Sequence, residues 1–162
     1  RAHAPGFEHA FLMLSAPQVG VRHSRRVLGV SRVTRAQWPT AMVHHDEIGV
    51  TPSVNPKWPN ISIPYGALVP ARLDGILAPG RHVSCDPNSH GFMREIPQCW
   101  VTGQAAGVAA AVAVSQGVLP REVDIARVQR ALRAQGVFLR TPEEARAAGL
   151  PDTIEAAGQQ AA

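Results

Sequence analysis

Two basic side chains and an open helix start give residues 78–100 the character of a binding pocket. A predicted strand end at Ala78–Arg81 is followed by a loop that carries His90 and Arg94, and then by Pro97, which suits the first turn of a helix. The first turn of a helix has free N–H groups and a partial positive charge, which stabilise an anion or an electron-rich ring oxygen. The spacing therefore predicts a cofactor pocket.

Gly103 and Gly107 lie four residues apart inside the same predicted helix. A glycine in a helix interior costs roughly 1 kcal/mol relative to alanine, so the pair needs a compensating gain. One interpretation is a close approach by another backbone or by a flat ligand. The other is tight packing of the helix on a sheet, and the glycines alone do not decide between the two.

The helix that bears these glycines is the strongest element in the sequence. It is predicted over residues 97–116, where it has no charged residue, and Gly117 ends it. Because it lacks a polar stripe, we expect it to be buried on nearly every side. A second helix is predicted after the cap residue Asp124 and ends at Gly136, and a third, short helix is predicted over residues 141–149.

Short extended segments dominate the residues before the long helix. Residues 1–33 are predicted to form strands joined by turns, and Thr34 is predicted to cap a single helical turn. The predicted extended segments are residues 11–14, 26–33, 47–50, 61–65 and 75–80. The fold class is therefore α/β, with a mixed sheet of short strands, a buried Ala/Gly-rich helix and carboxy-terminal helices.

The charge distribution supports a competing function. Lysine and arginine outnumber aspartate and glutamate by 16 to 12, and Arg22–Arg35 is rich in arginine and lacks a carboxylate. Such a stretch suits carboxylate or phosphate, so the alternative is a non-enzymatic module that binds an anion or nucleic acid. Aromatic side chains that would stack on bases are absent from the stretch, which argues against nucleic acid as a partner.

Composition disfavours several other kinds of protein and site. The two cysteines, Cys85 and Cys99, form no Cys-x-x-Cys pair, so we expect neither a disulfide scaffold nor a metal site. The longest apolar stretch, residues 100–114, is shorter than the roughly 20 residues of a membrane-spanning helix. We therefore expect no membrane partner and a cytoplasmic location.

Five motifs follow one another along residues 15–140. They are GVRHSRRVLG at 20–29, IPY at 63–65, LVP at 68–70, GILAPGRHVS at 75–84 and REIPQCWVTGQAAG at 94–107. In this order they resemble the carboxy-terminal half of the FAD-dependent oxidoreductase family. Residues 124–139 also resemble the closing helix of that family.

The resemblance implies a noncovalent FAD site made of two parts. An amino-terminal Gly-rich motif binds the ADP half in this family, and a later strand, loop and helix close over the flavin half. The strand end would meet the ribityl and pyrophosphate groups, and the helix start would face the pyrimidine edge of the flavin. The implied cofactor-binding residues are Ala78, Gly80, Arg81, Gln98, Cys99, Gly103, Gln104 and Gly107.

The resemblance also implies an enzyme that transfers hydride or electrons to or from a small organic substrate. Arg22, His90 and Arg94 are the candidate catalytic residues, because they could clamp a carboxylate or polarise a carbonyl near the flavin. Two alternatives stay open. Arg22 could be a solvated strand residue, and His90 could cap a turn in its loop.

The Gly-x-Gly-x-x-Gly motif that binds the ADP half is missing from the sequence. The resemblance therefore implies the carboxy-terminal part of a larger enzyme, inactive alone, whose partner is the missing amino-terminal FAD-binding segment of the same protein. Residues 1–60 would belong to a substrate-side β-rich region. Residues 61–140 would complete a Rossmann-like FAD domain, and residues 141–162 would form a helical tail.

Overall fold

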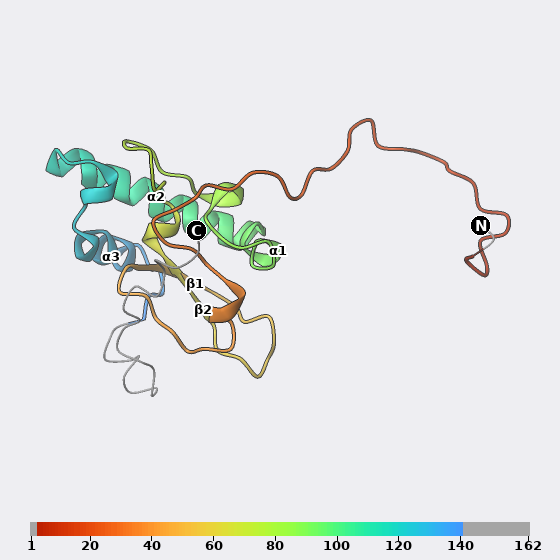
Figure 1. The fold of residues 1–162 in the computed structure, drawn as a ribbon, viewed down its shortest axis with the longest axis horizontal. Coiled ribbons are helices and arrows are strands. Elements are labelled where there is room, and N and C mark those ends of the chain that lie inside the picture. Colours follow the sequence, from red (N-terminus) through yellow and green to blue (C-terminus); the bar gives the residue numbers. More distant parts are fainter. Residues whose placement is uncertain (1–2, 141–162) are drawn as a thin grey trace.

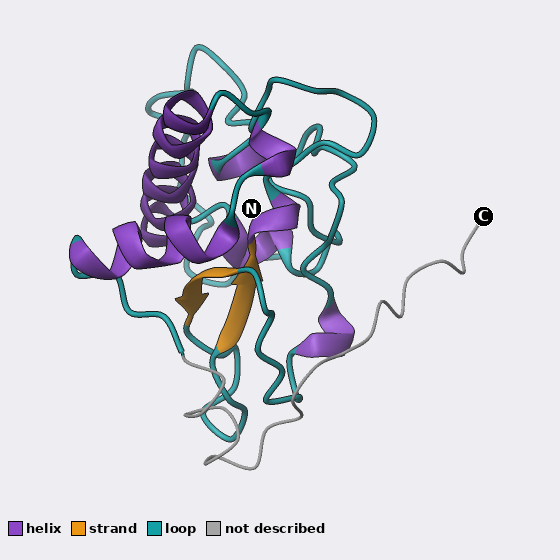
Figure 2. Ribbon diagram, turned by 90° about the vertical axis from the view of Figure 1, so that its left-hand side faces the viewer, coloured by secondary structure: helices purple, strands orange, loops and turns teal. Residues whose placement is uncertain are grey.

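Two strands precede three α-helices along residues 3–140, the part of the chain that the computed structural model describes. The strands are β1 (Glu47–Thr51) and β2 (Ile61–Pro64), and the helices are α1 (His90–Met93), α2 (Ile96–Gln116) and α3 (Ile125–Ala134) (Figure 1). Figure 2 shows the strands beside the helices, with loops forming much of the remainder. Helices with a small sheet agree with the predicted α/β class.

The regular sheet is an antiparallel pair instead of the expected mixed sheet. β1 and β2 pair with Thr51 opposite Ile61, and parallel pairing within residues 3–140 is limited to one isolated bridge between Val33 and Cys85. The predicted segment 75–80 forms no strand. It ends in a 3₁₀ turn, Gly80–His82, directly after Pro79, which has no N–H group to offer a neighbouring strand.

Residues 27–33 lie between two other segments but bend at Val30 and Ser31, so they match the extended prediction for 26–33 only in part. The N–H group of Val27 donates to the carbonyl of His82 at 2.9 Å, and that of Val33 donates to the carbonyl of Ser84 at 3.1 Å. The contacts are isolated bridges, so the segment is not a regular strand. It nevertheless fastens the start of the folded body to the loop that leads into α1.

Gly29 lies where three segments cross. A Cβ at this position would be 2.8 Å from the carbonyl oxygens of Gly66 and Ser31 and 2.7 Å from Ser84 Cβ. Because backbone oxygens cannot move aside cheaply, Gly29→Ala is expected to lower the free energy of unfolding by about 1–3 kcal/mol. Urea unfolding measures the loss, with Gly20→Ala as the control, since a Cβ at Gly20 meets nothing within 4 Å. Equal stabilities of the two variants would contradict the prediction.

Residues 3–21 leave the body as a long arm (Figure 1), and the contacts with the body begin at Arg22. The arm contains the run Phe11–Leu14, whose side chains are 75% to 85% exposed. The sequence predicts a strand here, but the run forms none in the structure. A strand needs neighbours for its N–H and C=O groups, and the described part of the chain offers this run no such neighbour.

α2 begins and ends close to the predicted bounds. It starts one residue before Pro97, and Gly117 ends it in the left-handed region with φ of 67°. One face packs against β1, α3 and the Gly80–His82 turn. The buried residues of that face are Gln98, Thr102, Ala105, Ala106, Ala109 and Ala113. In residues 3–140, none of the helices has both the length and the apolar character needed to cross a membrane.

The opposite face of α2 is open, so the expectation of burial on nearly every side is wrong. Ile96, Trp100 and Val114 are 64%, 73% and 83% exposed. A Cβ added at Gly103 or Gly107 would meet nothing within 4 Å. The physical reason is that the described residues supply packing partners for one face only, although neither face carries a charge.

α3 follows its predicted caps. Asp124 Oδ1 accepts the N–H group of Ala126 at 3.0 Å, and Gly136, with φ of 84°, comes just after the helix. Val128 and Leu132 are fully buried in the core beside β1 and α2. The helix predicted over 141–149 and the rest of the tail lie outside the described residues.

A buried ion pair ties the segment after α3 to β1. The carboxylate of Glu47, which is 1% exposed, accepts hydrogen bonds from Arg140 Nη2 at 2.6 Å and Arg140 Nε at 3.1 Å. It also accepts the N–H group of Arg140 at 2.8 Å and the hydroxyl of Ser62 at 2.6 Å. Both carboxylate oxygens are therefore satisfied, which is what a buried charge requires.

Candidate functional site

The Gly80–His82 turn packs against the first turns of α2, so the two predicted halves of the flavin-side site meet. The N–H group of Gly80 donates to Thr102 Oγ1 at 2.9 Å. Gly80 has φ of 69°, in the left-handed region that favours glycine, and a Cβ there would lie 3.8 Å from Cys99 Sγ. The close turn therefore depends on a glycine at position 80 and a hydroxyl at position 102.

The amino end of α2 is partly exposed, since Ile96 is 64% and Gln98 8% exposed, and it has unused donors. The N–H groups of Ile96 and Gln98 have no acceptor among the described residues, and Pro97 between them has no N–H group. Glu95 precedes the helix in extended conformation and makes no side-chain cap hydrogen bond. Free N–H groups and the partial positive charge at a helix start can bind an anion or a ring oxygen.

His90 lies beneath the turn and is 1% exposed. Its Nε2 is 3.1 Å from the carbonyl oxygen of Arg81, which assigns the proton to Nε2, because a carbonyl can only accept. Nδ1 is buried and has no partner within residues 3–140. The ring of His23 meets that of His90 edge-on, with centroids 4.5 Å apart. Burial is the main cause that lowers the pKa of His90, so its imidazole is neutral near neutral pH.

The free energy of unfolding is expected to fall as the pH drops below the ordinary histidine pKa. Below that pH the histidine takes up a proton in the unfolded chain, but His90 does not take one up in the folded chain. His44, whose pKa is also lowered chiefly by burial, adds to the same slope. Each group contributes at most about 1.4 kcal/mol per pH unit. Urea unfolding of His90→Asn should show a weaker pH dependence than the native protein between about pH 7 and pH 5. Parallel curves would show that His90 does not contribute.

Arg22 and Arg94 approach the same carboxylate. Arg94 Nη2 lies 3.2 Å from Glu95 Oε1, and Arg22 Nη2 lies 3.9 Å from the same oxygen. The side chain of Arg94 is 15% exposed and that of Arg22 is 68% exposed. With His23 on His90, these contacts bring all three candidate catalytic residues to the amino end of α2.

Three residues of this cluster escaped the sequence analysis. Thr102 holds the Gly80 turn, Glu95 joins the two arginines, and His23 packs on His90. Glu95 had a usable signal, since it is a carboxylate next to Arg94 at a predicted helix start. Thr102 and His23 had none, because their partners are far away in the sequence.

The side chains of Gln98 and Gln104 make their hydrogen bonds inside the chain. Gln98 is 8% exposed and donates from Nε2 to Thr51 Oγ1 at 2.7 Å. Gln104 is exposed and donates to Gln135 Oε1 at 2.9 Å. Gln98 Nε2 therefore fixes α2 to β1, whereas its Oε1 is buried and its backbone N–H group is free of an acceptor, both without a partner among residues 3–140.

Three other residues that the resemblance assigns to the cofactor differ in which polar groups they have left to bind a ligand. They are Ala78, Cys99 and Arg81. The N–H group of Ala78 donates to the carbonyl of Leu68 at 2.8 Å. Burial raises the pKa of Cys99, whose Sγ lies 3.4 Å from the carbonyl oxygen of Arg94. The side chain of Arg81 is exposed, next to the turn.

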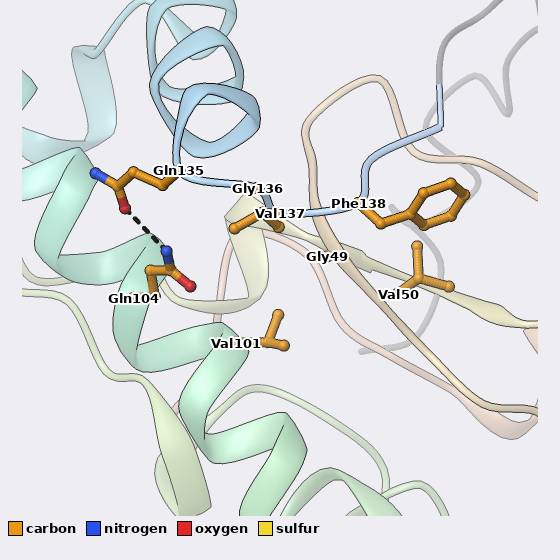
Figure 3. Close-up of a pocket in the computed structure, with 8 residues that line it drawn as sticks. All are labelled: Gly49, Val50, Val101, Gln104, Gln135, Gly136, Val137 and Phe138. Atoms are coloured by element: carbon orange, nitrogen blue, oxygen red, sulfur yellow. Dashed lines mark hydrogen bonds between the residues drawn. The ribbon is translucent and has the colours of Figure 1, made fainter.

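Two hollows occur away from the amino end of α2. Figure 3 shows the first, about 260 Å³, with Gln104 and Gln135 on one side and Phe138 beside Val50 on the other. Its lining residues are Gly49, Val50, Val101, Gln104, Gln135, Gly136, Val137 and Phe138. The second, about 370 Å³, is lined by Val27, Leu28, Pro70, Arg72 and Leu73. Among residues 3–140 no three His, Cys, Asp or Glu side chains are grouped for a metal ion.

Residues 1–132 match the FAD dependent oxidoreductase family. The chain belongs to this family. FAD is accordingly its cofactor, and oxidoreduction is its general chemistry. The match includes the Gly80–His82 turn, most of α3 and all of α2. Neither the curated proteins nor the solved structures include a match to this member of the FAD-dependent oxidoreductase family.

Proposed function

We propose that this chain is the carboxy-terminal part of an FAD-dependent oxidoreductase and closes the flavin half of the cofactor site. The amino-terminal FAD-binding segment of the same protein binds the ADP half. Residues 61–140 then complete a Rossmann-like domain, and residues 1–60 belong to the substrate side. The enzyme oxidises or reduces a small organic substrate.

The proposal is carried by the amino end of α2. Ile96 at this end is exposed, the N–H groups of Ile96 and Gln98 have no acceptor among residues 3–140, and the glycine turn at Gly80 packs beside the end. These features fit a flavin, because reduction places negative charge on the pyrimidine edge of the ring, and helix N–H groups stabilise that charge.

The open face of α2 supports the same proposal. Large apolar side chains stand at its ends, at Ile96, Trp100 and Val114, and the open glycines 103 and 107 lie between them. Exposing such a face to water costs free energy, so a packing partner is required. The rest of the cofactor domain is the partner that the family membership favours.

Under this proposal, each residue of the chain at the site has its own role. FAD, when bound, accepts or donates the hydride or electrons. Arg22 and Arg94 orient the substrate, and the N–H groups of Ile96 and Gln98 stabilise charge at the ring edge. Neutral His90 donates from Nε2 to the Arg81 carbonyl and so holds the turn in place.

The proposal is tested by purifying the complete protein and measuring its visible flavin absorption and the FAD released on denaturation. We expect equimolar FAD in the complete protein and none in residues 1–162 alone, since the ADP-binding motif is missing from the latter. A folded complete protein that stays colourless after incubation with FAD would refute the proposal.

A further inference from the structure

We propose that Arg94 and Arg22 form a receptor for a carboxylate group of the substrate, and that Glu95 occupies this receptor until the substrate displaces it. The inference rests on the proposed function, because it puts the anionic group of the substrate next to the flavin-side end of α2. It adds a chemical class to the substrate, namely a carboxylic acid.

The guanidinium of Arg94 is only half used. Its Nη2 lies 3.2 Å from Glu95 Oε1, whereas its Nε is buried and has no partner in the described part of the chain. Nε and Nη2 share one edge of the guanidinium plane, and a carboxylate binds such an edge with both oxygens. Glu95 is the next residue in the chain and reaches only one of the two donors. A free carboxylate that replaced Glu95 would have both donors of this edge to bind.

Arg22 makes the receptor two-sided. It lies where the amino-terminal arm meets the body, and its Nη2 lies 3.9 Å from the same Glu95 oxygen. Arg22 and Glu95 are 68% and 49% exposed, so water screens their attraction and Glu95 can be displaced at little cost. The structure thus already holds a carboxylate between the two arginines, but holds it weakly.

The surroundings favour an anion over a neutral group. The N–H groups of Ile96 and Gln98 add the positive end of α2 at the same place. The FAD diphosphate is the other anion available, but the family resemblance places it at the segment around Ala78–Arg81. The substrate carboxylate is therefore the better fit.

Malonate and its neutral analogue malonamide are the probes for the complete, FAD-loaded protein, and calorimetry and the flavin spectrum are the two readouts. We expect malonate to bind and malonamide not to bind. Arg94→Gln should weaken malonate binding by about tenfold or more, because a charge-assisted bidentate contact is lost. Glu95→Gln should strengthen it by about threefold, because the internal competitor is removed. Glu122→Gln, beyond the other end of α2, is the matched control and should change nothing.

The outcomes separate the two proposals. Unchanged malonate affinity in Glu95→Gln would overturn the receptor. Unchanged malonate affinity in Arg94→Gln would overturn it as well, whether or not that variant keeps FAD. A complete protein that binds no FAD would defeat the proposed function. The receptor would still stand in that case if calorimetry gave the expected order of malonate affinities, since that readout needs no flavin.

Discussion

Replacing Arg140 by alanine is expected to lower the free energy of unfolding by about 3–5 kcal/mol, because it leaves the carboxylate of Glu47 buried without its partner. Glu47 is 1% exposed, and three nitrogen atoms of Arg140 donate to it, including the backbone N–H group. The alanine variant keeps only the backbone contact and the hydroxyl of Ser62. Equilibrium unfolding in urea measures the loss.

Arg130→Ala is the control for the removal of an arginine near the same end of the chain. Arg130 is exposed on α3, and such surface substitutions usually stay within about 0.5 kcal/mol of the native stability. If Arg140→Ala cost no more than Arg130→Ala, the buried ion pair would not be what holds the segment after α3 to β1.

Leucine at both Gly103 and Gly107 is expected to abolish FAD retention in the complete protein without destabilising this chain. A Cβ at either glycine meets nothing within 4 Å, and leucine favours a helix more than glycine does. The free energy of unfolding of the chain should therefore stay equal or rise. The leucines would collide with the partner that covers α2, and such overpacking weakens FAD binding by about tenfold or more.

The alanine double variant at the same two glycines is the matched control. It raises helix propensity as leucine does but adds far less volume, so FAD retention should fall in the order glycine, alanine, leucine. FAD content is measured by visible absorption after gel filtration, and stability by urea unfolding. Full FAD content in the leucine variant would show that no partner covers this face of α2.

Elements with local signals could be predicted from the sequence. α2 and α3 begin and end near their predicted residues because caps and glycines act within one turn: Asp124 caps α3, and Gly117 ends α2. The two strands were also predicted, since the segments 47–50 and 61–65 are short, apolar and bounded by turns. The match to the FAD-dependent oxidoreductase family confirms the cofactor that the motif order implied.

Features that depend on distant partners could not be predicted. The run Phe11–Leu14 has the composition of a strand, but hydrogen bonding to a neighbour decides whether it becomes one. The lack of charge in α2 indicates burial, but it does not show that residues 3–140 cover only one face of the helix. Glu95 and His23 joined the site through contacts with Arg22 and His90 that sequence spacing does not reveal.

The most direct measurement is a crystal structure of the complete protein with FAD bound. We predict that the pyrimidine edge of the flavin lies about 3 Å from the N–H groups of Ile96 or Gln98, with Gly103 and Gly107 covered by the rest of the cofactor domain. A flavin bound elsewhere, with the amino end of α2 facing solvent, would contradict the assignment of this helix to the flavin site.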